Sequence, residues 1–247
     1  MNVMRGGYNL NMRPRRAWPV ALLLLLSACS FRNVGCGSLP EAPPPTPPDV
    51  LSGTAPAGGA SAVRVAFLGD SLTAGFGLLA SQAFPAQLEE MLAAEGYEID
   101  AVNAGISGDT TAGGLRRVEQ LLDPSTKILV VALGANDALR GLTVQQTHDN
   151  LARILDIALA RNIGVLLCGM EGPTNLGTDY RDAFREVYVN LLREYQGRIA
   201  LVPFLLEGVA GNPALNQPDG VHPTEEGAKI VAKTLYPKLR DLVDRAG

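Results

Sequence analysis

The sequence predicts a three-layer α/β/α sandwich built on a five-stranded parallel sheet, and three observations lead to this fold class. From residue 63 onward, short apolar runs alternate with longer segments whose apolar residues recur at helical spacing. The apolar runs are rich in valine, isoleucine and leucine without polar alternation, which is typical of strands buried on both faces of a parallel sheet. Glycine, asparagine and aspartate follow the runs, where turns are expected.

Each predicted element rests on this alternation. The strands are predicted from apolar runs bounded by turn residues, at 63–68, 99–103, 127–133, 163–168 and 199–202. The helices are predicted from helical periodicity, at 83–96, 111–122, 144–158, 179–195 and 224–243. Thr143 suits the N-cap of the third helix, and Thr224 suits the first turn of the last. Together they predict one domain of the flavodoxin-like type, with right-handed crossovers between parallel strands.

The first 61 residues have a different composition and are predicted to lie outside this domain. Arg13, Arg15 and Arg16 precede an apolar run at 17–26, which is shorter than the roughly 20 residues of a membrane span and is typical of a secretory signal peptide. The proline- and glycine-rich stretch that follows has few large apolar side chains with which to form a core. We therefore expect a lipoprotein-type signal peptide at 1–28, a flexible tether at 29–61 and the folded domain at 62–247.

Cys29 is the predicted site of lipid attachment. It follows Leu26-Ser27-Ala28, which resembles a bacterial lipobox, in which the cysteine is acylated and becomes the mature N-terminus. This predicts a protein of the bacterial cell envelope, periplasmic and anchored to a membrane, with the outer membrane favoured. An ordinary signal peptide cleaved nearby and an uncleaved anchor are the alternatives.

Composition excludes several classes of protein. The net charge of −4 and the lack of a basic stripe argue against a nucleic-acid partner. The three cysteines are far apart and form no disulfide framework, and Cys168 lies in an apolar run and is expected to be a core residue. The glycines after the first strand do not have the G-x-G-x-x-G spacing of a dinucleotide site. We predict no cofactor and no metal, and the sequence indicates no oligomeric state.

Ser71 lies in the turn Gly-Asp-Ser-Leu at 69–72, directly after the first predicted strand. A residue there lies at the carboxyl end of a strand, where open α/β sheets place their functional groups. A serine hydroxyl needs a base to take its proton. The chain has two histidines, and one of them, His222, lies in a turn three residues after Asp219, which is suited to orient the imidazole.

Four motifs resemble, in order, the sequence blocks of the GDSL or SGNH hydrolases. They are Gly69-Asp70-Ser71-Leu72, Asn103-Ala-Gly-Ile-Ser107-Gly108-Asp109-Thr110, Gly134-Ala-Asn136-Asp137 and Asp219-Gly-Val-His222-Pro223. The resemblance spans about residues 63–242, and within the family the chain looks most like the bacterial thioesterase I, lysophospholipase L1 and arylesterase group. It implies the SGNH hydrolase fold and a serine hydrolase that acts on ester bonds.

The residues and the resemblance together assign roles to five positions. Ser71 is the predicted nucleophile, His222 the base, and Asp219 the group that holds the imidazole. The resemblance adds three oxyanion donors, which are the backbone N–H of Ser71, the backbone N–H of Gly108 and the side-chain amide of Asn136. The expected reaction is hydrolysis of a small-molecule or lipid ester, such as an aryl ester, an acyl thioester or a lysophospholipid, through an acyl-enzyme.

Three alternatives are also compatible with the sequence. A carbohydrate acetylesterase has the same fold, and a tethered binding module without activity fits the domain organisation. A metal-dependent phosphohydrolase is the third, because four aspartates fall at predicted strand ends or loops of the same edge: Asp70, Asp109, Asp137 and Asp219. We expect the first three of these aspartates to support loops through hydrogen bonds rather than to react.

Other residues near the motifs have structural interpretations. His148 shares a helical face with apolar residues and is expected to be a partly buried structural histidine. Six apolar loop residues either line an acyl pocket or belong to a lid and the core: Phe76, Leu78, Leu79, Leu139, Leu142 and Met170.

Overall fold

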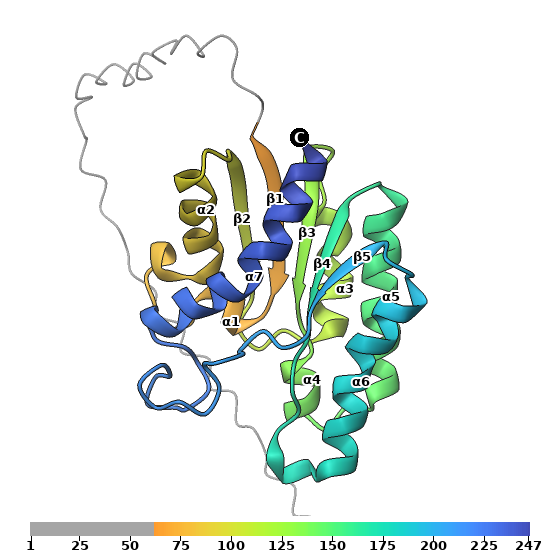
Figure 1. Ribbon diagram of the computed structural model, residues 1–247. Coiled ribbons are helices and arrows are strands. Elements are labelled where there is room, and N and C mark those ends of the chain that lie inside the picture. Colours follow the sequence, from red (N-terminus) through yellow and green to blue (C-terminus); the bar gives the residue numbers. More distant parts are fainter. Residues whose placement is uncertain (1–61) are drawn as a thin grey trace, which may run out of the picture. The chain divides into compact units, whose positions relative to one another are not determined.

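The computed structural model describes residues 62–247, in which a five-stranded parallel sheet lies between two layers of helices (Figure 1). The strands lie in the order β2-β1-β3-β4-β5 and all pair in parallel. Their bounds are β1 (Val63–Gly69), β2 (Ile99–Gly105), β3 (Thr126–Ala132), β4 (Gly164–Cys168) and β5 (Ile199–Val202). The predicted fold class is confirmed.

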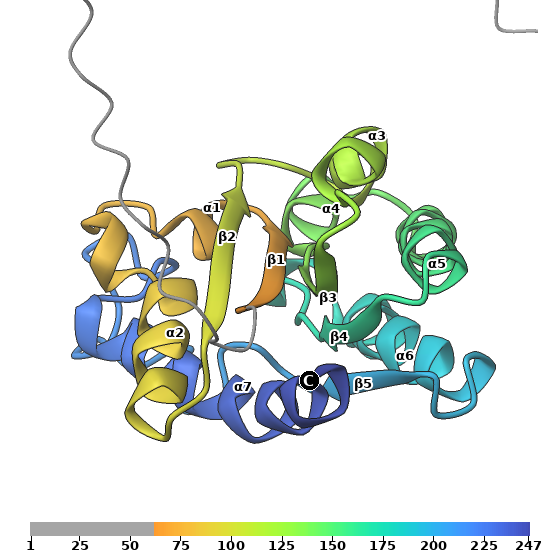
Figure 2. The same cartoon turned by 90° about the horizontal axis from the view of Figure 1, so that it is seen from above.

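Helices cover both faces of the sheet, as the view from above shows (Figure 2). One layer consists of α2 (Phe84–Ala94) and α7 (Glu225–Ala246), and the other of α3 (Thr111–Leu121), α5 (Val144–Ala160) and α6 (Thr178–Glu194). The strands are therefore shielded from water on both sides, and the central runs Val65 to Leu68 and Ile128 to Leu133 are buried. Cys168 is fully buried in this core, where desolvation raises the pKa of its thiol.

The predicted signal peptide, tether and acylated Cys29 lie outside the described residues. Within residues 62–247, no helix combines the length and the apolar character that a membrane crossing requires.

The structure contains short helices that the sequence pattern did not predict. These are α1 (Ser71–Ala74), α4 (Ala135–Leu139) and the 3-10 turns η1 (Ala80–Gln82) and η2 (Thr174–Leu176). One turn of helix is too short to show a 3.6-residue period, so the pattern cannot reveal it. Their presence matters because α1 and α4 begin within two or three residues of the ends of β1 and β3, at the edge of the sheet where the strands end (the carboxyl edge).

The position of α1 depends on close packing of its backbone against β2. β2 is two residues longer than predicted because Ala104 and Gly105 still pair with β1. A Cβ on Gly105 would lie 2.1 Å from the backbone nitrogen of Ala74, the last residue of α1. Glycine at position 105 therefore allows α1 to lie directly on the strand end.

Candidate active site

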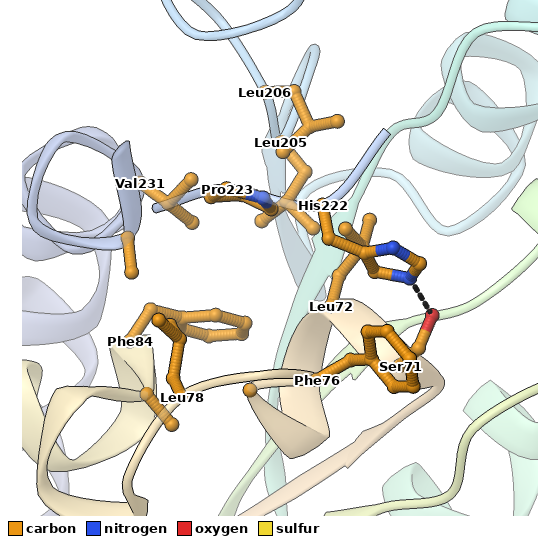
Figure 3. A pocket seen from close by; sticks show the side chains of 13 residues that line it. Ser71, Leu72, Phe76, Leu78, Phe84, Leu205, Leu206, His222, Pro223 and Val231 are labelled. Atoms are coloured by element: carbon orange, nitrogen blue, oxygen red, sulfur yellow. Dashed lines mark hydrogen bonds between the residues drawn. The ribbon is translucent and has the colours of Figure 1, made fainter. Parts of the chain in front are cut away.

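Ser71, His222 and Asp219 form a continuous chain of hydrogen bonds at the carboxyl edge. Ser71 is the first residue of α1, and His222 lies in the turn that precedes α7. The Ser71 Oγ is 2.8 Å from Nε2 of His222 (Figure 3), and Nδ1 of His222 is 2.7 Å from Oδ2 of Asp219. The structure thus brings together three residues that are up to 151 positions apart in the sequence.

Asp219 is held in its ionised form by the turn in which it lies. Its Oδ1 accepts the backbone N–H groups of Val221 at 2.9 Å and His222 at 3.0 Å. The hydrogen bond from the backbone N–H of His222 has the largest effect on the pKa of Asp219, followed by the bond from the His222 side chain. With the bond from Val221, they lower the pKa of Asp219 to about 2. Because a carboxylate only accepts, the proton lies on Nδ1 of His222 and Nε2 is free to accept the Ser71 hydroxyl.

The imidazole is also fixed from its other side. The ring centroid of Phe76 lies 4.6 Å from that of His222, and Figure 3 shows the two rings beside Ser71. The backbone N–H of Gln217 donates to the carbonyl of His222 at 2.7 Å. The side-chain amide of Gln217 donates to the carbonyls of Phe76 at 2.6 Å and Pro223 at 2.9 Å. Gln217 therefore joins the loop of Phe76 to the turn of His222.

Asp70 links α1 to α4 through its buried carboxylate. Its Oδ1 accepts the backbone N–H of Leu72 at 3.0 Å and so caps α1, and its Oδ2 accepts Nδ2 of Asn136 at 3.0 Å. The residue is 1% exposed, and this burial raises the pKa of Asp70 to about 6 against the hydrogen bonds that lower it. An amide nitrogen carries two hydrogens, so the second N–H of Asn136 is available to another acceptor.

Gly108 lies in the loop between β2 and α3, with a backbone φ of 79° that favours glycine. Its carbonyl accepts Nη2 of Arg140 at 2.7 Å, which joins this loop to the end of α4. Among the hydrogen bonds of residues 62–247, none is donated by the backbone N–H of Ser71 or of Gly108. Both groups are therefore available to a bound acceptor.

Arg117 holds the three segments around Gly108 and Ser71 together, and the sequence patterns did not identify it. From α3, its Nη1 donates to the carbonyl of Ala104 at 2.7 Å and its Nη2 to that of Gly69 at 3.0 Å. Its Nε donates to Asp109 at 2.8 Å. One sequence feature could have indicated this role: Arg117 lies three residues after the buried Gly114, so the helical period places a charged side chain on the buried face of the helix.

The other aspartates at this edge support loops, as expected. Asp109 pairs with Arg117, and the fully buried Asp137 accepts the backbone N–H of Thr111 at 2.9 Å together with its hydroxyl. Within residues 62–247, no three His, Cys, Asp or Glu side chains are arranged to hold a metal ion. His148 lies elsewhere, 3.1 Å from Glu194, and is partly buried.

Two hollows of different size lie near the Ser71–His222 pair. Ser71 and His222 line the small one, and their chain neighbours Leu72 and Val221 line the large one. The large cavity, of about 350 Å³, lies between α1, α4 and the loops after β4 and β5, and its apolar lining includes Leu72, Leu139, Met170, Leu206 and Val221. The small recess beneath His222 has about 10 Å³, roughly the room of one water, and its lining includes Phe76, Leu78, Phe84, Leu205 and Val231 (Figure 3). Of the six apolar loop residues, four therefore line a hollow, whereas Leu79 and Leu142 line neither of these two.

Replacing Arg117 with alanine is expected to lower the free energy of unfolding by about 3 kcal/mol. Asp109 and two strand-end carbonyls would lose their charged donor at once. The matched control is Arg116→Ala on the same helix, because Arg116 is exposed and its side chain makes no hydrogen bond or ion pair within residues 62–247. The control should stay within about 0.5 kcal/mol in denaturant unfolding. Equal losses in both variants would contradict the bonding described for Arg117.

The buried carboxyl of Asp70 should give the protein a measurable pH dependence. Its pKa is about 6 when folded and takes the ordinary value of 3.8 when unfolded, so its stabilising contribution is full below pH 3.8 and is lost as pH rises through 6. Lowering the pH from 7.5 to 4.5 should raise the free energy of unfolding of wild type relative to Asp70→Asn by about 2 kcal/mol. Denaturant unfolding of both proteins at the two pH values measures this. A difference that does not change with pH would refute the assignment.

Comparisons with known proteins agree with this geometry. The sequence profile of the GDSL-like lipase/acylhydrolase family matches residues 67–230. The chain is 42% identical to esterase TesA of Pseudomonas aeruginosa over 74% of this chain and 91% of that protein. It is 38% identical to thioesterase 1/protease 1/lysophospholipase L1 of Escherichia coli K12 over 75% of this chain and 87% of that protein.

A solved structure gives the same result at the level of the fold. The crystal structure of AlinE4, an SGNH-hydrolase family esterase, superimposes with a TM-score of 0.63 at 39% identity. The match covers 74% of this chain and 98% of that one. The chain therefore belongs to the GDSL-like lipase/acylhydrolase family and is a hydrolase of ester bonds.

Proposed function

We propose that this protein is a serine esterase that cleaves carboxylic esters through an acyl-enzyme. The Ser71 Oγ attacks the ester carbonyl carbon while its proton passes to Nε2 of His222. The C–O bond to the leaving group then breaks, and His222 returns the proton to the departing oxygen. A water attacks the acyl-enzyme in the same way, with His222 again as the base, and releases the acid and free Ser71.

The observation that carries this proposal is the unbroken chain from Ser71 through His222 to the ionised Asp219. Charge also develops on the carbonyl oxygen, which needs donors that are already in place. The N–H groups of Ser71 and Gly108 and the free N–H of the Asn136 amide meet this need. Asp70 orients that amide, and Arg140 and Arg117 hold the loop of Gly108.

We assign the acyl chain of the substrate to the large cavity. Its lining is mainly apolar near α1 and α4, and its volume exceeds that of the small recess more than tenfold. The similar proteins are named as an esterase and as a thioesterase and lysophospholipase. Aryl esters, acyl thioesters and lysophospholipids with a medium or long acyl chain are therefore the proposed substrates, and a carbohydrate acetylesterase is the alternative.

We further propose that the protein is a periplasmic lipoprotein anchored through Cys29. The support is the sequence Leu26-Ser27-Ala28-Cys29 at the end of an apolar run preceded by arginines. Residues 29–61 would then connect the acylated N-terminus to the domain. Labelling of cells with a clickable fatty acid, followed by isolation of wild type and Cys29→Ala, tests the attachment.

Substitutions at the proposed catalytic residues should separate their roles. Ser71→Ala and His222→Ala are expected to reduce kcat to near background, because nucleophile and base act as a unit. Asn136→Ala removes one of three oxyanion donors and should reduce kcat by about 10² to 10³, with a smaller effect on KM. Initial rates with a p-nitrophenyl ester measure these changes. Esterase activity that survives in Ser71→Ala would rule out the proposed mechanism.

The acyl preference can be measured with p-nitrophenyl esters from acetate to palmitate, with EDTA present throughout. The volume and lining of the large cavity lead us to expect the highest kcat/KM beyond acetate, because each buried methylene contributes about 0.8 kcal/mol. Serine-dependent activity that is greatest on acetate would favour the acetylesterase. Activity that EDTA abolishes would indicate a metal-dependent reaction instead.

A further inference from the structure

The exposed large apolar side chains of residues 62–247 gather at one edge of the molecule. Six such residues are between 37% and 69% exposed: Phe76, Leu79, Ile106, Leu139, Leu176 and Val221. We refer to these six side chains as the rim patch. Isolated exposed apolar residues are common on protein surfaces, but a gathering on one face marks an interaction surface.

Each of the five connections at the carboxyl edge contributes to the rim patch. Phe76 and Leu79 follow β1, and single residues follow each of the other strands: Ile106 after β2, Leu139 after β3, Leu176 after β4 and Val221 after β5. In Figure 1 this edge is the lower one, where α1 and α4 lie. None of the six belongs to the opposite edge.

Part of the rim patch lies at the large cavity and at His222. Leu139 and Val221 both line the large cavity, and Phe76 packs on His222. Leu176 is separated by one residue from Thr174, which also lines that cavity. An acyl chain that enters the cavity would therefore pass close to Leu139 and Val221. A surface of this kind suits a substrate that is delivered from an apolar phase rather than from water.

Charge favours apolar insertion over electrostatic attraction as the means by which such a surface would bind lipid. The chain carries a net charge of −4, which gives it no general attraction to an anionic membrane.

The proposed anchor also permits the rim patch to reach the membrane. Residues 29–61 would span at most about 110 Å if extended, whereas a domain of this size is about 40 Å across. The domain begins at the amino end of β1, so a linker of this length can place the opposite edge on the same membrane.

We propose that the rim patch docks the enzyme on a lipid surface, so that the large cavity draws its acyl substrate directly from that surface. This inference rests on the proposed function, since it concerns the delivery of substrate to the same site. Docking would then increase the rate of hydrolysis of lysophospholipids and other membrane-resident acyl esters. Soluble short esters would reach the site without it.

Two tryptophan reporters test which edge touches the lipid. Trp18 is the only tryptophan in the sequence, so Trp18→Phe provides a background without tryptophan fluorescence. In this background, Leu79→Trp places a reporter in the rim patch, and Glu98→Trp places one at an exposed site near the amino end of β2. Phosphatidylcholine vesicles with a bromine- or doxyl-labelled lipid are then added.

Leu79→Trp is expected to shift its emission to the blue and to be quenched several-fold more than Glu98→Trp, independently of salt. Equal quenching of both, quenching of Glu98→Trp alone, or no quenching would overturn the docking proposal. A blue shift that grows with protein concentration without vesicles would indicate a second copy of the chain as the partner and would also overturn it. The same reporters in Ser71→Ala protein give the binding result even if the esterase mechanism fails.

A kinetic comparison completes the test. The double variant Leu79→Ser, Ile106→Ser changes two exposed residues that line neither hollow. Its kcat/KM on a soluble short ester should equal that of wild type, whereas its rate on a long-chain ester in vesicles should fall roughly tenfold. Glu98→Leu, which adds an apolar side chain at the opposite edge, should change neither rate. An unchanged vesicle rate in the double variant would contradict the proposal.

Discussion

Five parallel strands end at the same edge of the sheet, and the arrangement of the site depends on this constraint. Parallel strands are joined by crossover connections. Each connection therefore begins at the carboxyl end of its strand, and all of these ends lie at the same edge of the sheet. Ser71, Gly108 and Asn136 follow three adjacent strands, and His222 reaches them from the connection before α7. The topology of the sheet alone thereby brings segments that are distant in sequence to the same edge.

Buried and partly buried charges then give these loops their final positions. Asp70 caps α1 and holds the amide of Asn136, and Arg117 joins two strand ends to Asp109 beside Gly108. Burial of a charge is costly, and these groups offset the cost with two or three hydrogen bonds each. The pKa of Asp70 is still raised, which indicates that its hydrogen bonds stabilise the carboxylate less than water does in the unfolded chain. The loops of the site are thus fixed by buried charges at some cost to the free energy of unfolding.

Much of this arrangement was accessible from the sequence, and the remainder was inaccessible for identifiable reasons. The apolar runs predicted all five strands, and the turn motifs predicted which residues would converge at the carboxyl edge. The helices α1 and α4 are shorter than the period by which helices are recognised. Arg117 acts on carbonyl groups, which every residue carries, so no pattern of side chains indicated its partners. Whether Phe76 and Leu139 line a hollow depends on loop conformation, which sequence periodicity does not encode.

The proposed mechanism requires that Ser71 becomes covalently acylated during turnover. Its most direct test is reaction of the folded, active protein with a fluorophosphonate probe, followed by peptide mass spectrometry. A single adduct on the peptide that contains Ser71, formed in proportion to the loss of esterase activity and absent from His222→Ala, is the result expected. Full loss of activity with an adduct at another residue, or retained activity after Ser71 is fully labelled, would contradict the mechanism.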